Sequence, residues 1–266
     1  MQITNQNRIL YSSELIEPPF KYSSKGDTLT MKTFLFDYGG TLDTSACHWF
    51  YVFQEAYQNN GLQIAEPQLR EAYVMGERAL AKERIVMPED DFATMLSKKI
   101  KVQVEHLQAQ SLLHFDDNEE KLRTINKLTT YCDSFARKHI AASSLILSKL
   151  REKYHMIIVS NFYGNLHTVL KTYGILHFFD EVVESSVVGV RKPDPAIWQL
   201  GVKASGLSAS DCIAVGDSFN KDIVPASSVG CETVWFEGRE WEDKTYDQTI
   251  PTHIIHSLSE LLALYA

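Results

Sequence analysis

Short apolar runs alternate with amphipathic helical patterns through the second half of the chain. The runs that we expect to be strands are residues 33–36, 155–159, 181–184, 212–215, 232–236 and 253–255. Runs of this length, rich in β-branched and aromatic residues, are typical of buried strands. Helical patterns lie between them, including 142–153, 164–174 and 219–229. Such alternation predicts an α/β fold, a doubly wound and mostly parallel sheet with helices on both faces.

The stretch between the first and second runs, residues 46–139, has a different pattern. It contains four amphipathic stripes at helical spacing, the first of which ends at Asn60 and Gly61. Because no strand pattern interrupts the stripes, we expect a separate helical domain at 46–139. The sheet domain would then consist of residues 31–45 and 140–266.

Composition narrows the class of protein. The 266 residues, 44% hydrophobic and 23% charged, are typical of a globular chain of one or two domains. Residues 1–30 are polar and predict a poorly ordered extension. A net charge of −8 argues against nucleic acid or an anionic membrane as a partner. The four cysteines show no metal-binding spacing, and no signal peptide or long apolar run is present, so we expect reduced thiols and a cytoplasmic location.

Polar residues that could act in catalysis or in ligand binding follow several of the predicted strands. Asp37 comes directly after the run 33–36 and precedes Gly39, Gly40 and Thr41. Ligands of open α/β sheets bind at the carboxyl ends of strands. The other residues of this kind are Ser160 and Asn161 after the second run, Lys192 in a loop, and Asp217 and Asp222 after the run 212–215.

In this order, these residues resemble the motifs of the haloacid dehalogenase-like (HAD) hydrolase superfamily: DxDGT, then Ser or Thr, then Lys, then GDxxxxD. The resemblance covers roughly residues 32–265. It implies a Rossmann-like core with an α-helical cap inserted after the first motif. One residue departs from the pattern, since Gly39 stands where the second Asp of DxDGT is expected.

The resemblance implies a Mg²⁺-dependent phosphatase that acts on a small phosphorylated metabolite. Asp37 would be the nucleophile that forms an aspartyl-phosphate, and Ser160 and Lys192 would contact the transferred phosphoryl group. The remaining implied roles are phosphate binding by Gly40, Thr41 and Asn161, and Mg²⁺ binding by Asp37, the Gly39 carbonyl, Asp217 and Asp222.

Gly39 leaves alternatives open because the family's phosphatases carry a general acid–base at this position. General acid–base catalysis contributes about 10²- to 10⁴-fold in rate. A dehalogenase, a phosphonate hydrolase with a cap lysine (Lys82, Lys98 or Lys99), and a weakly active or non-catalytic phosphate-binding protein are therefore the other readings. Asp43 is interpreted as a turn residue, and His48 and Arg191 as neighbours of the site with structural or surface roles.

Overall fold

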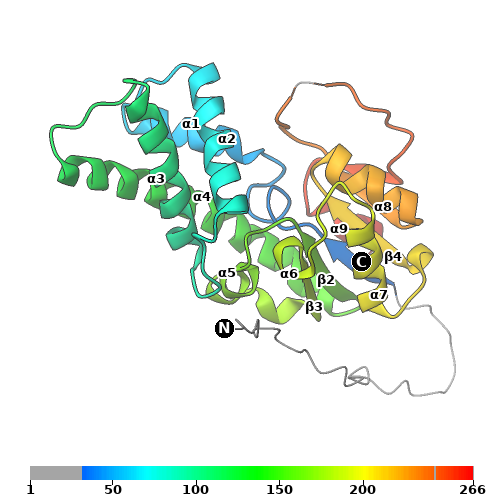
Figure 1. Ribbon diagram of the computed structural model, residues 1–266. Coiled ribbons are helices and arrows are strands. Elements are labelled where there is room, and N and C mark those ends of the chain that lie inside the picture. The colour runs from blue at the N-terminus through cyan, green and yellow to red at the C-terminus, as the bar shows by residue number, and fades with distance from the viewer. Residues whose placement is uncertain (1–31, 243, 266) are drawn as a thin grey trace, which may run out of the picture. The chain divides into compact units, whose positions relative to one another are not determined.

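The computed structural model describes residues 32–242 and 244–265, so the extension expected at residues 1–30 lies outside the described part. Six parallel strands form one sheet in the order β3-β2-β1-β4-β5-β6 (Figure 1). They are β1 (Thr33–Phe36), β2 (His155–Ser160), β3 (Glu181–Glu184), β4 (Cys212–Gly216), β5 (Glu232–Phe236) and β6 (His253–Ile255). The predicted doubly wound α/β fold is confirmed, and all six strands lie where the apolar runs predicted them.

Helices cover both faces of the sheet. Successive side chains of a strand point to opposite faces, and Phe34 and Phe36 of β1 therefore belong to a different core cluster from Leu35. The Phe34 face packs against α5 (Leu166–Thr172), α9 (Glu260–Tyr265) and the end of a long helix of the insertion. The Leu35 face packs against α7 (Ala196–Ser205) and α8 (Val224–Val229). Short helical turns lie between these elements, namely α6 (Ser185–Val188), η1 (Leu176–Phe178), η2 (Ala209–Asp211) and η3 (Phe219–Ile223).

The insertion between β1 and β2 is helical, as predicted. It consists of α1 (Trp49–Asn59), α2 (Glu66–Lys82), α3 (Phe92–Ala109) and α4 (Asn118–Arg151). Local sequence signals begin these helices: side chains of His48, Asp91 and Asp117 cap α1, α3 and α4, and Pro67 lies in the first turn of α2. These are the residue types that helix starts favour, apart from His48.

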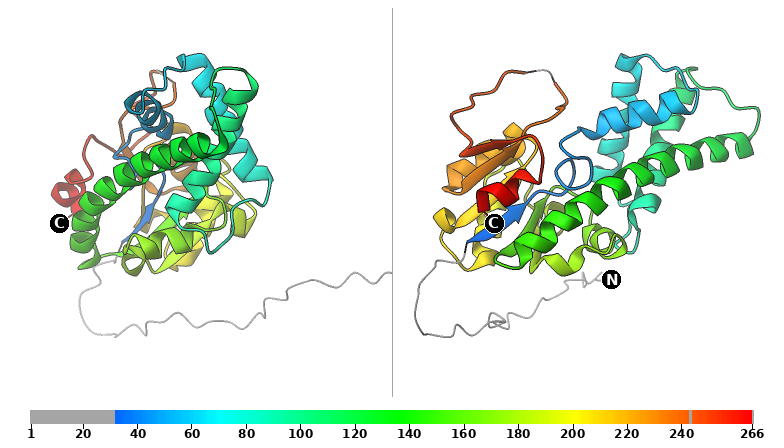
Figure 2. Two further views of the ribbon diagram at one scale, coloured as in Figure 1. Left: turned by 90° about the vertical axis from the view of Figure 1, so that its left-hand side faces the viewer. Right: turned by 180° about the vertical axis from the view of Figure 1, so that it is seen from behind.

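Helix α4 corrects the expected element boundaries. The sequence predicted that the last helical stripe ends within 46–139 and that a separate helix follows at 142–153, but α4 is one helix of 34 residues. No glycine or proline interrupts it between Asn118 and Arg151, so nothing in the backbone forces an end. It runs from the other inserted helices down to the sheet (Figure 2), where Ser143 Oγ donates to the carbonyl of Leu42 at 2.8 Å. The domain division at 139/140 falls inside α4 and stays a prediction.

Two observations bear on the chain's environment. All four cysteines have free thiols, and Cys132, Cys212 and Cys231 are buried, as expected. Across residues 32–242 and 244–265, every helix is too short or too polar to cross a membrane. The cytoplasmic location stays a prediction.

Candidate active site

Asp37 and Lys192 form the centre of a buried ionic cluster. Strand β1 lies between β2 and β4, which places Asp37 at the carboxyl end of the sheet's middle. Lys192 Nζ donates to Asp37 Oδ1 at 2.5 Å and to Asp222 Oδ1 at 2.6 Å. Both partners of the lysine are almost fully shielded from solvent. Burial lowers the pKa of Lys192, but the carboxylates of Asp222 and Asp37 outweigh it, so the pKa lies above its ordinary value.

Two hydroxyl groups hold the Asp37 carboxylate in place. Ser160 Oγ donates to Asp37 Oδ1 at 3.2 Å. Thr41 Oγ1 lies 3.2 Å from Asp37 Oδ2 and 2.8 Å from Asp217 Oδ1, and it accepts the backbone N–H of Asp217 at 3.1 Å. A hydroxyl has one proton, so Thr41 donates to only one of the two carboxylates at a time. Thr41 thereby ties the loop after β1 to the loop after β4.

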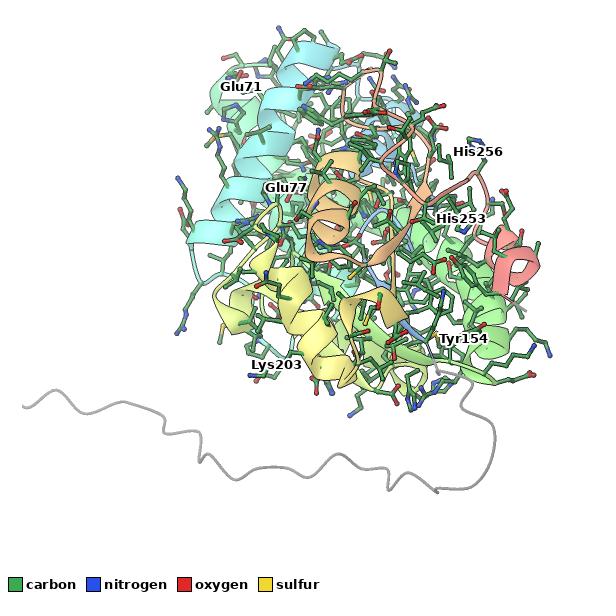
Figure 3. All side chains as sticks on the ribbon, turned by 90° about the vertical axis from the view of Figure 1, so that its right-hand side faces the viewer. Glu71, Glu77, Tyr154, Lys203, His253 and His256 are labelled. Carbon is green, nitrogen blue, oxygen red and sulfur yellow. The ribbon has the colours of Figure 1, made fainter. Side chains whose placement is uncertain are left out.

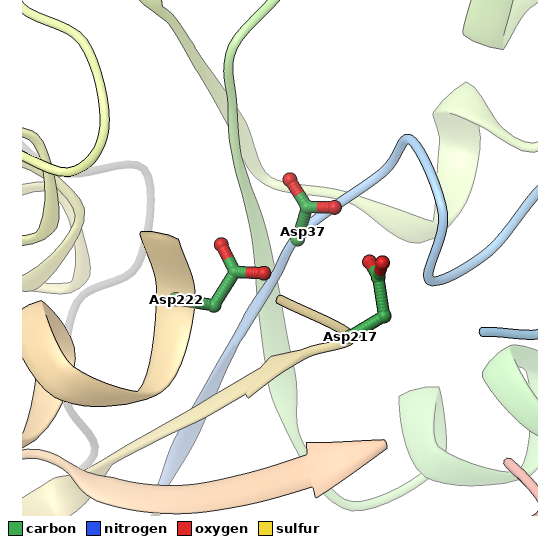
Figure 4. Close-up of side chains that lie close together, drawn as sticks. All are labelled: Asp37, Asp217 and Asp222. Atoms are coloured by element: carbon green, nitrogen blue, oxygen red, sulfur yellow. The ribbon is translucent and has the colours of Figure 1, made fainter. Parts of the chain in front are cut away.

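Three carboxylates meet at this point with one lysine among them. Asp37, Asp217 and Asp222 each offer an oxygen within 4.8 Å of the others (Figure 4). Burial, together with the neighbouring Asp37 and Asp222, raises the pKa of Asp217 well above its usual range. Burial also raises the pKa of Asp222 to about 6, with Lys192 opposing and Asp37 reinforcing the shift. Carboxylate oxygens are the ligands that Mg²⁺ prefers, and the donor set therefore fits a hard divalent cation.

The two adjacent glycines after β1 have opposite requirements. Gly40 has φ +104°, and a Cβ there would stand 2.5 Å from Asp217 Oδ1. Only glycine allows that close approach without strain. Gly39 is exposed, its φ is outside the left-handed region, and an added Cβ would have no heavy atom within 4 Å. A side chain at position 39 is therefore sterically possible, and the glycine there is not required by the backbone.

Two residues that the sequence associated with phosphate have other contacts. Asn161 Oδ1 accepts the backbone N–H of Lys192 at 2.8 Å, and its Nδ2 donates to the Lys192 carbonyl at 3.1 Å. The backbone N–H of Gly40 donates to Asp43 Oδ1 at 2.7 Å. In this conformation, Asn161 orients the loop that carries Lys192, and the Gly40 N–H is already used. Their predicted role in phosphate binding stays untested.

Asp43 closes the turn after β1, which agrees with its interpretation as a turn residue. It is fully buried, and its Oδ2 accepts the indole N–H of Trp49 at 3.0 Å. Burial is the main cause that raises its pKa to about 7. His48 is half-buried and contacts the rings of Tyr73 and Trp241, and burial is the main cause that lowers its pKa to about 4. The interpretation of His48 as structural agrees with these contacts.

The sequence missed a polar group in the insertion. Glu77 of α2, labelled in Figure 3, pairs with Lys99 of α3, and both contact Tyr163 in the loop after β2. Lys99 was one of three equivalent candidate lysines. The structure separates it from Lys98, which pairs with Asp90, and from Lys82, which is exposed at the end of α2. No spacing rule could have found the group, because its members come from three separate segments.

The chain belongs to the haloacid dehalogenase-like hydrolase family, whose model matches residues 31–230. It is 36% identical over 106 residues to haloacid dehalogenase-like hydrolase domain-containing protein 3 of Danio rerio, covering 40% of this chain and 43% of that protein. It is 37% identical over 89 residues to a glyceraldehyde 3-phosphate phosphatase of Methanocaldococcus jannaschii, covering 34% and 39%. Each alignment therefore spans less than half of the relative's own length.

The fold is also similar to that of a HAD-hydrolase of Bacillus subtilis, YfnB, solved bound to magnesium. The TM-score is 0.51 at 17% identity, and the match covers 88% of this chain and 97% of that one. At this identity the likeness concerns the fold alone.

Proposed function

We propose that the protein is a Mg²⁺-dependent phosphatase that hydrolyses a small phosphorylated metabolite through an aspartyl-phosphate on Asp37. The observation that carries this proposal is the Asp37 carboxylate itself, held by Lys192, Ser160 and Thr41 beside Asp217 and Asp222. A carboxylate whose Oδ1 accepts hydrogen bonds from both Lys192 and Ser160 is held in one orientation for attack on a group placed above it. The alignment with a phosphatase of glyceraldehyde 3-phosphate supports the substrate class.

The residues divide the chemistry among them. An oxygen of Asp37 attacks phosphorus, the bond from phosphorus to the leaving oxygen breaks, and water then cleaves the acyl phosphate to regenerate the carboxylate. Lys192 and Ser160, which already reach Asp37 Oδ1, are placed to donate to the phosphoryl oxygens. Mg²⁺ held by Asp37, Asp217, Asp222 and the Gly39 carbonyl would supply the positive charge that lets two anions approach each other.

Gly39 sets the range of leaving groups. Without a carboxylic acid at this position, the leaving oxygen departs with less help from a proton donor. The open, exposed space beside Gly39 holds no protein side chain within reach of a Cβ. Aryl and acyl phosphates, whose leaving groups carry negative charge well, should therefore be hydrolysed faster than alkyl esters such as sugar phosphates.

The other activities weighed for the family receive less support from the geometry. Asp217 and Asp222 complete a site suited to a cation, which attack on a halogen-bearing carbon does not need. A phosphonate hydrolase would need a neutral lysine amine that forms a Schiff base. Lys99 Nζ instead donates to Glu77 Oε1 at 2.7 Å and to Tyr163 OH at 2.9 Å, so its amine is held by protein groups rather than free to attack a carbonyl.

A direct test measures hydrolysis of p-nitrophenyl phosphate and a panel of phosphorylated metabolites with Mg²⁺ and with excess EDTA. We expect Mg²⁺-dependent release of phosphate, abolished by EDTA and restored by added Mg²⁺. Brief turnover followed by acid quenching should trap phosphate on the peptide that contains Asp37. Absence of phosphate release from every ester, or turnover unaffected by EDTA, would contradict the proposal.

A further inference from the structure

A polar bridge joins the inserted helices to the loop after β2. We define the polar bridge as Glu77, Lys99 and Tyr163. Lys99 Nζ donates to Glu77 Oε1 at 2.7 Å and to Tyr163 OH at 2.9 Å, and Tyr163 OH donates to Glu77 Oε2 at 2.5 Å. Every member therefore contacts the other two. The Lys99 side chain is only 7% exposed.

The ionisation states of Glu77 and Tyr163 are fixed near neutral pH. Burial opposes ionisation of Glu77, but Lys99 and Tyr163 outweigh it and lower its pKa. Burial and the Glu77 carboxylate raise the pKa of Tyr163 well above its usual range, so the phenol keeps its proton. The Glu77 side chain is 33% exposed, and a partly buried ion pair is a weak source of stability because desolvation and solvent screening cancel much of its attraction. The location of the pair, rather than its strength, indicates what it does.

Tyr163, the member of the polar bridge in the loop after β2, lies two residues beyond Asn161 in the chain. The side chain of Asn161 accepts from the N–H of Lys192 and donates to its carbonyl, and Lys192 in turn reaches Asp37 and Asp222. A chain of direct contacts therefore runs from the polar bridge through the loop to the lysine of the active site.

The sheet domain holds the backbone of the same loop on either side of Tyr163. The N–H of Phe162 donates to Ser185 Oγ at 3.2 Å, and the N–H of Leu166 donates to Glu184 Oε2 at 3.3 Å. With its neighbours anchored to the sheet domain, Tyr163 extends its side chain to the inserted helices. The loop is thus held by the sheet domain through its backbone and by the inserted helices through the polar bridge.

We propose that Glu77 and Lys99 are positioning residues, which act through Tyr163 and Asn161 to set the orientation of Lys192 for phosphoryl transfer. The inference rests on the proposed phosphatase function for its kinetic consequence. Because Lys192 contacts the transferred phosphoryl group and not the leaving group, the consequence should be the same for every ester that the protein hydrolyses.

The first experiment compares Lys99→Met with Lys101→Met, a control on the same helix whose side chain is exposed. Lys99→Met should lower kcat by about 10- to 100-fold, the size of effect that a small misplacement causes, with KM little changed. Aryl and alkyl esters should lose the same factor, and Lys101→Met should match the wild type. A loss confined to one kind of leaving group would overturn the inference, because Lys99 would then touch substrate directly.

Tyr163→Phe provides a variant in which the ion pair of Glu77 and Lys99 stays intact. It removes only the hydroxyl, so folding should be preserved, and kcat should fall in the same uniform way. In an Asn161→Ala background, Lys99→Met should have little further effect, because both changes interrupt one chain of contacts. Additive losses in the double variant would overturn the proposed route through Asn161.

A third measurement needs no activity. The backbone N–H of Lys192, bonded to Asn161, should exchange with solvent deuterium faster in Lys99→Met and Tyr163→Phe than in the wild type or Lys101→Met. Unchanged exchange would overturn the inference even in an active enzyme. Faster exchange in a protein that hydrolyses no phosphate ester would contradict the proposed function while supporting the positioning role.

Discussion

The carboxyl end of the sheet and the polar bridge each bury a lysine against carboxylates, but their charge balance differs. Lys192 contacts Asp37 and Asp222, with Asp217 close by, so three acids share one cation. Lys99 pairs with the single acid Glu77 and a neutral phenol. The pKa values follow this difference: those of Asp217 and Asp222 are raised, whereas that of Glu77 is lowered.

This difference separates a site that lacks positive charge from one that is complete. The carboxyl end of the sheet, which we call the sheet end (Asp37, Lys192, Asp217 and Asp222), is stabilised by a bound cation or by protonation. Its excess negative charge suits the cation that a metal-dependent phosphatase binds. The polar bridge has no such deficit, and its three members use their polar atoms on one another. It is therefore suited to holding a loop rather than to binding an ion.

The largest effect is expected at the sheet end for Asp37→Asn. An amide is a poor nucleophile, so phosphate release should fall by about 10³-fold or more, as for other nucleophile replacements. Because the change also removes one of three crowded negative charges, the metal-free melting temperature should stay the same or rise. Kinetic assays and thermal unfolding without metal measure the two effects. Activity within tenfold of the wild type would contradict the nucleophilic role.

Lys192→Met should lower kcat/KM by a factor that corresponds to a loss of about 2–4 kcal/mol of transition-state stabilisation. This is comparable to the loss of an oxyanion donor. It also leaves Asp37 and Asp222 without their shared counter-charge, so the metal-free protein should be less stable than Lys99→Met, in which one acid is left unpaired. Denaturant unfolding of both variants makes the comparison. Equal stability of the two would mean that the excess charge at the sheet end has little energetic weight.

Gly40→Ala and Gly39→Ala test how closely the sheet end is packed. Gly40→Ala would place a Cβ against the Asp217 carboxylate at a residue with positive φ, and it should therefore reduce Mg²⁺-dependent turnover by about tenfold or more. The second meets open space and should leave turnover within about twofold, since a surface change of this kind is usually mild. Titration of activity with Mg²⁺ should show weaker activation only in Gly40→Ala. The reverse order of sensitivity would contradict the geometry of the two glycines.

Much of this structure could be predicted from sequence, for a physical reason. Each strand of a parallel sheet is buried on both faces, so its residues form a continuous apolar run. The residues at the strand ends then follow by position, as with Asp37 after β1 and Asp217 after β4. The unity of α4 was missed because the change of pattern near residue 140 comes from a change of neighbours, not from a helix-breaking residue.

The polar bridge could not be predicted because it depends on tertiary contacts alone. Lys99 and Glu77 are 22 positions apart, and Lys99 and Tyr163 are 64 apart, far outside the spacing at which helical side chains meet. Its position also depends on Gly76, where a Cβ would press to 3.1 Å from Lys99 Cγ. The hydrogen bonds between the Asn161 side chain and the backbone of Lys192 could not be predicted either. The order of the motifs does not tell which backbone groups an amide side chain contacts.

Gly39→Asp should sharpen the contrast by adding a possible proton donor to the sheet end. The open space and ordinary φ at this position permit the side chain. Turnover of alkyl phosphates should rise by about tenfold, within the range of general acid catalysis, while turnover of aryl phosphates changes little. Thermal unfolding of the variant serves as the control for misfolding. If the wild type already hydrolyses alkyl and aryl esters at similar chemical rates, another group donates the proton and the argument from Gly39 is wrong.

The smallest effect, and the one that compares both regions in a single measurement, is the dependence of stability on pH. Asp217 and Asp222 have raised pKa values when folded, to about 6 for Asp222, so the folded state binds protons more tightly than the unfolded state there. Their ionisation destabilises the fold, and the free energy of unfolding of the metal-free protein should therefore rise as pH falls from about 8 to 5. Glu77 has a lowered pKa, and its contribution is present above the unfolded value of about 4.3 and lost as pH falls below it.

Urea unfolding at a series of pH values should thus give a maximum of stability at about pH 5, below the transition of Asp217 and Asp222 and above that of Glu77. Asp217→Asn should flatten the rise between pH 8 and 5, and Glu77→Gln should alter mainly the acid side. Mg²⁺ should stabilise the wild type more at pH 8 than at pH 5, because protons and the cation compete for the same carboxylates. Because Asp43 and His48 also have shifted pKa values, to about 7 and about 4, the comparison of Asp217→Asn with the wild type is the decisive one. If that change leaves the dependence of stability on pH between 8 and 5 unaltered, the sheet end carries no excess charge, and the contrast with the polar bridge is lost.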